Sequence, residues 1–136
     1  MTQGKIADIL QMRGDLDGAL TLHGERLDVA HEMQDAESIA HIQFSRAQIR
    51  LARNEHEGPG IQTIYEELAE AFGAALKIQR PDAIGPIGSL LGQILAAGGQ
   101  RDQARQVLEA AANAFATLGQ EEMVVQVRAA INKVGG

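Results

Sequence analysis

The chain has 136 residues, of which 45% are hydrophobic and 22% charged, so it is long enough for one folded domain and is not a disordered segment. Its formal net charge of −6, without any run of Lys or Arg, argues against nucleic acid and anionic membranes as partners. It has no cysteine, which excludes disulfide bonds and thiolate zinc sites, and it lacks a signal peptide and a long apolar stretch, so we expect a soluble cytoplasmic protein.

Apolar residues recur at helical spacing along the whole chain, and no segment reads convincingly as a strand. In chain order, the pattern predicts helices over about residues 3–12, 16–33, 36–53, 61–78, 87–97, 102–118 and 121–134. Gly14 provides a sharp turn after the first helix, and Asp15 is the expected N-cap of the second. The connections are short, so neighbouring helices are expected to run antiparallel.

Proline and glycine set the expected boundaries in the middle of the chain. Pro59, which stands between two glycines, is the strongest helix breaker. Residues 80–86 contain two further prolines and form the second predicted break, so the fifth helix is expected to begin only at Ile87. Gly98-Gly99 ends that helix, and Gly119 ends the next one.

Two segments of the chain nearly repeat each other. KIADILQMRGDLDGA at residues 5–19 aligns with LLGQILAAGGQRDQA at residues 90–104. The matched positions include Ala7 with Gly92, Gly14 with Gly99, Asp17 with Asp102 and Ala19 with Ala104. An internal repeat of this kind indicates stacked copies of one helical unit, and such stacks usually offer a surface for a partner.

These small residues and the glycine turn resemble the hairpin of the tetratricopeptide repeat family. The resemblance implies an all-α fold, a right-handed α-solenoid of three antiparallel helical hairpins over residues 3–34, 36–79 and 86–119, closed by a capping helix over residues 121–134. The average spacing of about 42 residues exceeds the standard 34, which brings the chain closer to the longer hairpins of kinesin light chains and bacterial signalling arrays. The second hairpin fits less well, because Arg46 and Arg50 stand where apolar residues are usual.

In this family the first helix of each hairpin lines the concave face, so the resemblance implies a groove for a partner. The implied groove residues are Asp8, Gln11 and Met12, then His41, Phe44, Ser45, Gln48 and Leu51, then Ser89, Gln93 and Ala96. Asp8, Gln48 and Gln93 would form a row of polar groups for an extended peptide. Apolar anchors would come from Met12, Phe44 and Leu51.

The histidines and the adjacent acidic residues give little indication of a metal site or of acid–base catalysis. His23 and His31 are eight residues apart, whereas helical metal ligands are usually three or four apart, so we expect partly exposed histidines and no metal site. Adjacent acids such as Glu66-Glu67 and Glu121-Glu122 point in different directions and are expected to face solvent. We therefore expect no catalytic residue and no cofactor.

The expected function is a non-catalytic scaffold that binds a protein or peptide partner on its concave face. One alternative is self-association, as in a homodimer, because the N-terminal hairpin has no cap of its own. The missing cap is also compatible with a chain that is a fragment of a longer repeat array. A small-ligand sensor or an enzyme on a helical scaffold is a further alternative.

Overall fold

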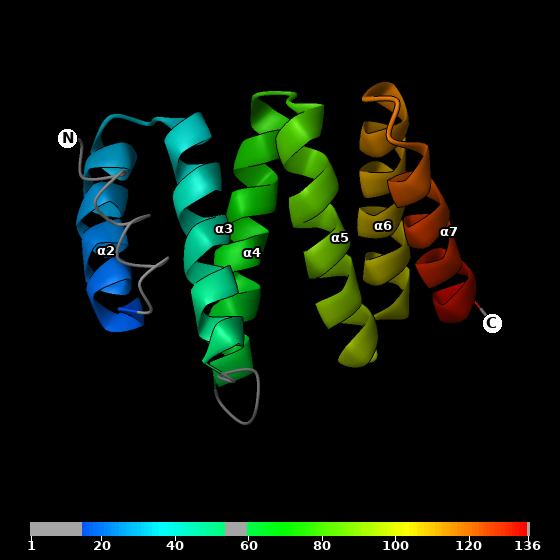
Figure 1. Cartoon of the computed structure of the whole chain (residues 1–136), viewed down its shortest axis with the longest axis horizontal. Coiled ribbons are helices and arrows are strands. Elements are labelled where there is room, and N and C mark those ends of the chain that lie inside the picture. Colours follow the sequence, from blue (N-terminus) through cyan, green and yellow to red (C-terminus); the bar gives the residue numbers. More distant parts are fainter. Residues whose placement is uncertain (1–14, 54–59, 136) are drawn as a thin grey trace. The chain divides into compact units, whose positions relative to one another are not determined.

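The computed structural model describes residues 15–53 and 60–135 (Figure 1). Within these ranges the chain forms α-helices and no strand, which confirms the all-α prediction. The helices are α2 (Leu16–Glu32), α3 (Ala36–Ala52), α4 (Gly60–Lys77), α5 (Pro81–Ala97), α6 (Arg101–Thr117) and α7 (Glu121–Gly135). The helix predicted over residues 3–12, with Asp8, Gln11 and Met12, lies outside the described residues.

The chain divides into two compact units, Met1–Ala74 and Ala75–Gly136, and each is described by itself. The first unit holds α2, α3 and most of α4, and the second holds α5, α6 and α7. None of the helices in the described parts of the chain combines the length and apolarity needed to cross a membrane.

In the first unit, α2 and α3 each begin at an aspartate cap. The Asp15 side chain accepts a hydrogen bond of 2.9 Å from the Gly18 amide, as expected from the sequence. Asp35 caps α3 by accepting from the amide of Ser38 at 3.2 Å and from its hydroxyl at 2.6 Å. Gln34, with φ of 53°, turns the chain between the two helices. The bounds of both helices therefore agree with the prediction to within a residue or so.

The apolar core of the first unit is built from alanine, isoleucine and leucine side chains. Leu27 and Ala30 of α2 pack with Ile42 of α3, and Asp17 and Arg53 join the two helices by an ion pair of 2.7 Å. Within the first unit, the remaining buried apolar residues of α3 and α4 are Ala40, Ala47, Ile49, Ile64, Leu68 and Ala71. These positions follow the helical spacing seen in the sequence.

In the second unit, α6 lies between α5 and α7 in packing order. Glycine allows α5 to approach α6 closely: a Cβ at Gly92 would lie 2.5 Å from Leu108, and one at Gly85 would lie 2.8 Å from the Phe115 ring. The core that α6 shares with α7 contains Leu108, Phe115, Val127 and Ile131.

The predicted start of the fifth helix is wrong. Helix α5 begins at Pro81 instead of Ile87 and contains Pro86, so the break expected over residues 80–86 shortens to a turn ending at Arg80. Pro81 fits because the first helical position needs no amide donor. Pro86 costs one backbone hydrogen bond in the second turn, but Gly85 and Gly88 are buried there. Tertiary packing of α5 thus outweighs the local cost of Pro86.

Candidate functional site

The second unit carries a groove of about 520 Å³ on its surface, which we call the α5–α7 groove. It is lined by Gln93 and Ala96 of α5, Arg101 and Leu108 of α6, and Gln126, Ala129, Ala130, Lys133 and Val134 of α7. A groove of this volume is within the range of pockets that hold small ligands or the anchoring side chains of a peptide.

The lining residues of the α5–α7 groove combine positive charge, amides and an apolar surface. Its charged members, Arg101 and Lys133, are both cations and both exposed. Gln93 and Gln126 are exposed amides that can both donate and accept hydrogen bonds. Leu108, only 1% exposed, belongs to the core beneath the groove. The set suits a ligand with a carboxylate, free backbone polar groups and an apolar side chain.

Helical periodicity explains how α7 presents its side of the groove. Gln126, Ala129, Ala130 and Lys133 follow the i, i+3, i+4, i+7 spacing and therefore share one face. Val127 and Ile131, on the adjoining face, are buried against α6 and hold α7 in place. The small residues Ala129 and Ala130 leave the space that the longer flanking side chains border.

The predicted groove residues fall into different environments. In the second unit, Gln93 and Ala96 do line the α5–α7 groove, and Ser89 lies beside it, accepting a hydrogen bond of 3.4 Å from the Gln93 amide. In the first unit, His41 and Gln48 are exposed, Phe44 and Leu51 are partly buried, and Ser45 is buried. Ser45, at 8% exposed, offers little surface to a partner. The expected row of Asp8, Gln48 and Gln93 stays a prediction.

Sequence reasoning missed most of the α7 and α6 side of the groove. Arg101 of α6 and Gln126 and Lys133 of α7 are not among the candidate groove residues named from the sequence. Their shared face on α7 is readable from the spacing, but nothing in the sequence indicates that this face borders Gln93. That juxtaposition follows from the packing of α7 on α6.

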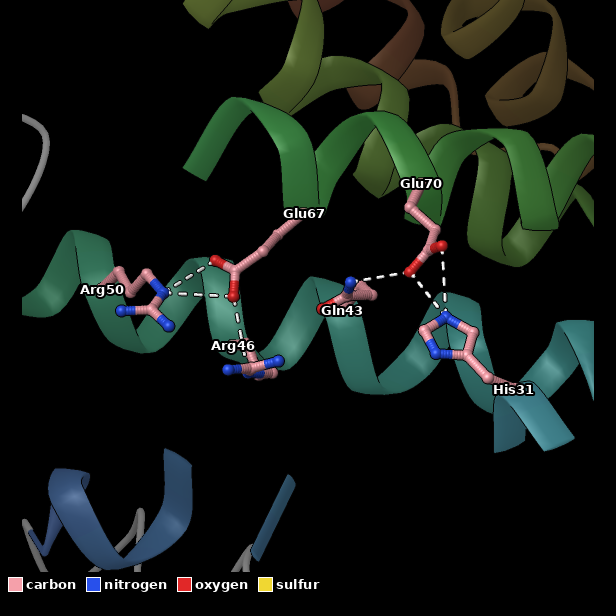
Figure 2. A network of polar contacts seen from close by, with 6 residues as sticks. All are labelled: His31, Gln43, Arg46, Arg50, Glu67 and Glu70. Carbon is pink, nitrogen blue, oxygen red and sulfur yellow. Dashed lines mark hydrogen bonds and ion pairs between the residues drawn. The ribbon is translucent and has the colours of Figure 1, made fainter. Parts of the chain in front are cut away.

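A second polar cluster lies inside the first unit, where α3 and α4 meet (Figure 2). Glu67 of α4 is 5% exposed, although the pair Glu66-Glu67 was expected to face solvent. That expectation holds for Glu66, which is exposed, and is wrong for Glu67. Consecutive helical residues point about 100° apart, so one of two adjacent acids can be buried while the other is solvated.

Two arginines of α3 neutralise this buried acid. The Nε of Arg50 donates to both carboxylate oxygens of Glu67, at 2.9 and 3.1 Å, and the Nε of Arg46 lies 3.4 Å from Oε2. Arg46 and Arg50 are one turn apart on the same face of α3, and Figure 2 shows both directed toward Glu67. The two residues that fit the repeat pattern poorly are therefore those that pair with Glu67.

Glu70, one turn after Glu67, continues the cluster toward α2. Its Oε1 accepts a hydrogen bond of 2.7 Å from the amide of Gln43, which is 7% exposed. The Nε2 of His31 lies 3.1 and 3.2 Å from the two Glu70 oxygens, and Figure 2 shows Gln43 and His31 converging on Glu70. These polar contacts connect α2, α3 and α4, so we interpret the cluster as a structural network that stabilises their packing.

The histidines divide between core and surface. His31 and His41 are exposed, in line with expectation, but His23 is 0% exposed, and its Nδ1 lies 3.1 Å from the Nη1 of Arg26. The prediction of a partly exposed His23 is wrong because its position shares the buried face of α2 with Ala19, Leu27 and Ala30. Residues 15–53 and 60–135 contain no cluster of three or more side chains that could hold a metal ion.

Comparison with known proteins gives no family for this chain. No model of a protein family matches it. No curated protein matches it significantly in sequence. The resemblance to tetratricopeptide repeats therefore depends on the near-repeat of residues 5–19 and 90–104 in the sequence.

Proposed function

We propose that the protein is a non-catalytic interaction module of the cytoplasm that binds a peptide or a helix of a partner protein in the α5–α7 groove. The observation that carries this proposal is the lining of the groove, in which two cations and two amides border an apolar base. A bound polypeptide needs partners for its backbone, a contact for an apolar side chain and a counter-charge for an acidic one, and the lining residues supply each.

The charged residues indicate which peptides would be preferred. Arg101 begins α6 and Lys133 stands near the end of α7, and both belong to the lining of the groove. A carboxylate placed in the groove would meet these two cations, and an apolar side chain beside it would contact Ala130 and Val134. We expect bound segments to combine acidic and apolar residues.

The fold that we propose for this module is the right-handed α-solenoid of tetratricopeptide-like hairpins. Its support is the close packing of α5 on α6 at small residues and the cover that α7 gives to α6. In such a hairpin, α5 would be the first helix and would face the groove, as Gln93 and Ala96 do.

The test is selection of peptides from a displayed random library on the full chain, followed by fluorescence anisotropy with the labelled, enriched peptides. Ala129→Trp fills the groove from an exposed position of α7, and Ala116→Trp, on an exposed position of α6 outside the lining, is the matched control. Lys133→Glu reverses a groove charge, with Lys77→Glu as its control.

We expect enriched peptides with acidic and apolar residues whose binding weakens by about tenfold in Ala129→Trp and Lys133→Glu and persists in both controls. If the groove variants bind the enriched peptides as tightly as the unmodified chain, the groove is not the site. If selection enriches no peptide, the proposed function is wrong.

A further inference from the structure

Helix α2 and its C-cap present an exposed row of acidic and apolar residues, which we call the acidic face of α2. It consists of Glu25, Asp28, Val29, Glu32 and Met33, at the spacing i, i+3, i+4, i+7, i+8. All five are exposed, and the two apolar members are 51% (Val29) and 72% (Met33) exposed. Large apolar residues one turn apart between acids form a small amphipathic surface on the helix.

This face lies opposite the side of α2 that the first unit uses. The buried residues of α2 are Ala19, His23, Leu27 and Ala30, which lie on the other side of the helix by the 100° rotation per residue. Within residues 15–53 and 60–135, the buried packing of α2 therefore does not include Val29 and Met33. Their exposure leaves them available to a second molecule.

Charge is distributed unevenly along the chain. The first 74 residues contain 13 acidic and 6 basic residues, a net charge of −7, and the remaining 62 contain 5 acidic and 6 basic residues, a net charge of +1. The acidic face of α2 belongs to the negative unit, and the α5–α7 groove, with Arg101 and Lys133, belongs to the other. The second unit is nearly neutral overall, so the attraction between two copies is local and comes from the acids on α2 of one copy meeting Arg101 and Lys133 of the other.

We infer that the occupant of the α5–α7 groove is the acidic face of α2 from a second copy of this chain. The inference rests on the proposed function, because it names the partner of that same groove. In this arrangement Asp28 and Glu32 meet the cations of the groove, and Val29 and Met33 contact its apolar base, which is the helix-in-groove mode of recognition.

The two surfaces of this interface are different, so association is head-to-tail. Every copy has one acidic face and one groove, and each bound copy therefore presents a further groove or face to the next. Such contacts close into a ring or extend as a chain, depending on the rotation between copies. Because opposite charges contribute, the association weakens as salt screens them.

The first experiment measures the mass of the full chain by light scattering across concentration at low and high salt. We expect a mass of 14.5 kDa in dilute solution that rises with concentration at low salt and rises less at high salt. Two double variants break the interface from either side: Asp28→Lys with Glu32→Lys on the acidic face, and Ala129→Trp with Lys133→Glu in the groove.

Mixing these two variants separates head-to-tail pairing from any symmetric alternative. Each variant alone is expected to stay at 14.5 kDa, because one copy lacks the face and the other lacks the groove. Their equimolar mixture retains one intact face and one intact groove, so it forms a dimer of twice that mass and nothing larger. Glu66→Lys with Glu122→Lys makes the same charge change outside both surfaces and is expected to associate like the unmodified chain. Circular dichroism checks that all variants keep their helices.

A mass of 14.5 kDa at every concentration and low salt overturns the inference, and so does a mixture that stays monomeric while the unmodified chain associates. The selection of peptides from the displayed library tests the proposed function separately. If the chain stays monomeric and selected peptides still bind the groove, the module exists and takes another protein as its partner. If both fail, the groove has neither role.

Discussion

Glu67 on α4 accepts two hydrogen bonds from the Nε of Arg50 on α3, at 2.9 and 3.1 Å, while only 5% of the residue is exposed. Charges removed from water in this way require a partner, since an unpaired carboxylate at such depth costs several kcal/mol. Arg46 contributes a second positive charge from the same side. We expect this pairing to favour the face of α3 that carries Arg46 and Arg50 at the contact with α4.

Replacing Glu67 by Gln should destabilise the protein by about 2 to 3 kcal/mol, because it removes the buried carboxylate charge that the guanidinium groups of Arg46 and Arg50 face. Urea unfolding followed by circular dichroism measures the change. Glu66→Gln, at the exposed neighbouring position, is the control and should alter stability by less than about 0.5 kcal/mol. Equal effects of the two substitutions would show that the buried pair adds nothing specific.

Gly92→Ala tests the close approach of α5 and α6. The added methyl group would lie 2.5 Å from Cγ and Cδ2 of Leu108, a side chain that is 1% exposed and cannot move aside freely. We expect a loss of about 1 to 3 kcal/mol from overpacking, despite the better helix propensity of alanine.

Gly73→Ala is the matched control on α4, since a Cβ there would meet nothing within 4 Å. It should stabilise the protein by about 0.5 to 1 kcal/mol through helix propensity alone. Thermal unfolding of both variants distinguishes the two effects by sign. A gain in Gly92→Ala would contradict the packing that the structure shows.

Pro86→Ala should raise the melting temperature, because the new amide can donate to the carbonyl of Asp82 in the second turn of α5. The expected gain is about 1 kcal/mol, since the unfolded chain also becomes more flexible without the proline ring. Pro81→Ala, at the first helical position, gains no such hydrogen bond and should not stabilise the helix. Scanning calorimetry compares the two, and a lower melting temperature for Pro86→Ala would contradict the expectation.

The aspartate cap of α3 should make the free energy of unfolding fall at acidic pH. The hydroxyl and the amide of Ser38, in that order, lower the pKa of Asp35 below 3.8. The folded state thus favours the charged carboxylate, so its contribution is complete above pH 3.8 and is lost as the pH falls through the lower folded pKa.

Asp35→Ala should therefore reduce the melting temperature at neutral pH, and its difference from the unmodified protein should shrink below pH 3.8. Melting curves between pH 2 and 7 measure this difference. Glu66→Ala, at an exposed position of α4 away from the cap of α3, serves as control. A difference that stays constant over the whole pH range would show that the charge of Asp35 is not what stabilises the cap.

Local signals predicted most of the helices because they depend on neighbours in sequence. Asp15 and Asp35 begin helices by capping amides three residues on, and Gly119, with φ of 72°, ends α6 in the conformation that glycine adopts most easily. Pro86 misled the prediction because its local cost is real, yet the buried glycines around it pack α5 against α6.

Two residues named from the sequence line the α5–α7 groove, while the concave-face groove over three hairpins stays a prediction. Gln93 and Ala96 were singled out from the repeat and do line the groove. Arg101 and Lys133 were not, because the cations come from different helices and are 32 residues apart in the sequence. Only the packing of α6 with α7 brings them to one surface.

By itself the sequence determined the helical content, most helix ends and the faces that alternate along each helix, because these follow from residues within a turn or two of one another. The tertiary structure decided which acid is buried, which arginines neutralise it and which side chains share a groove. Those outcomes depend on contacts between different helices. The free energy of burying Glu67, for example, is set by the arginines of α3 and not by its neighbours in sequence.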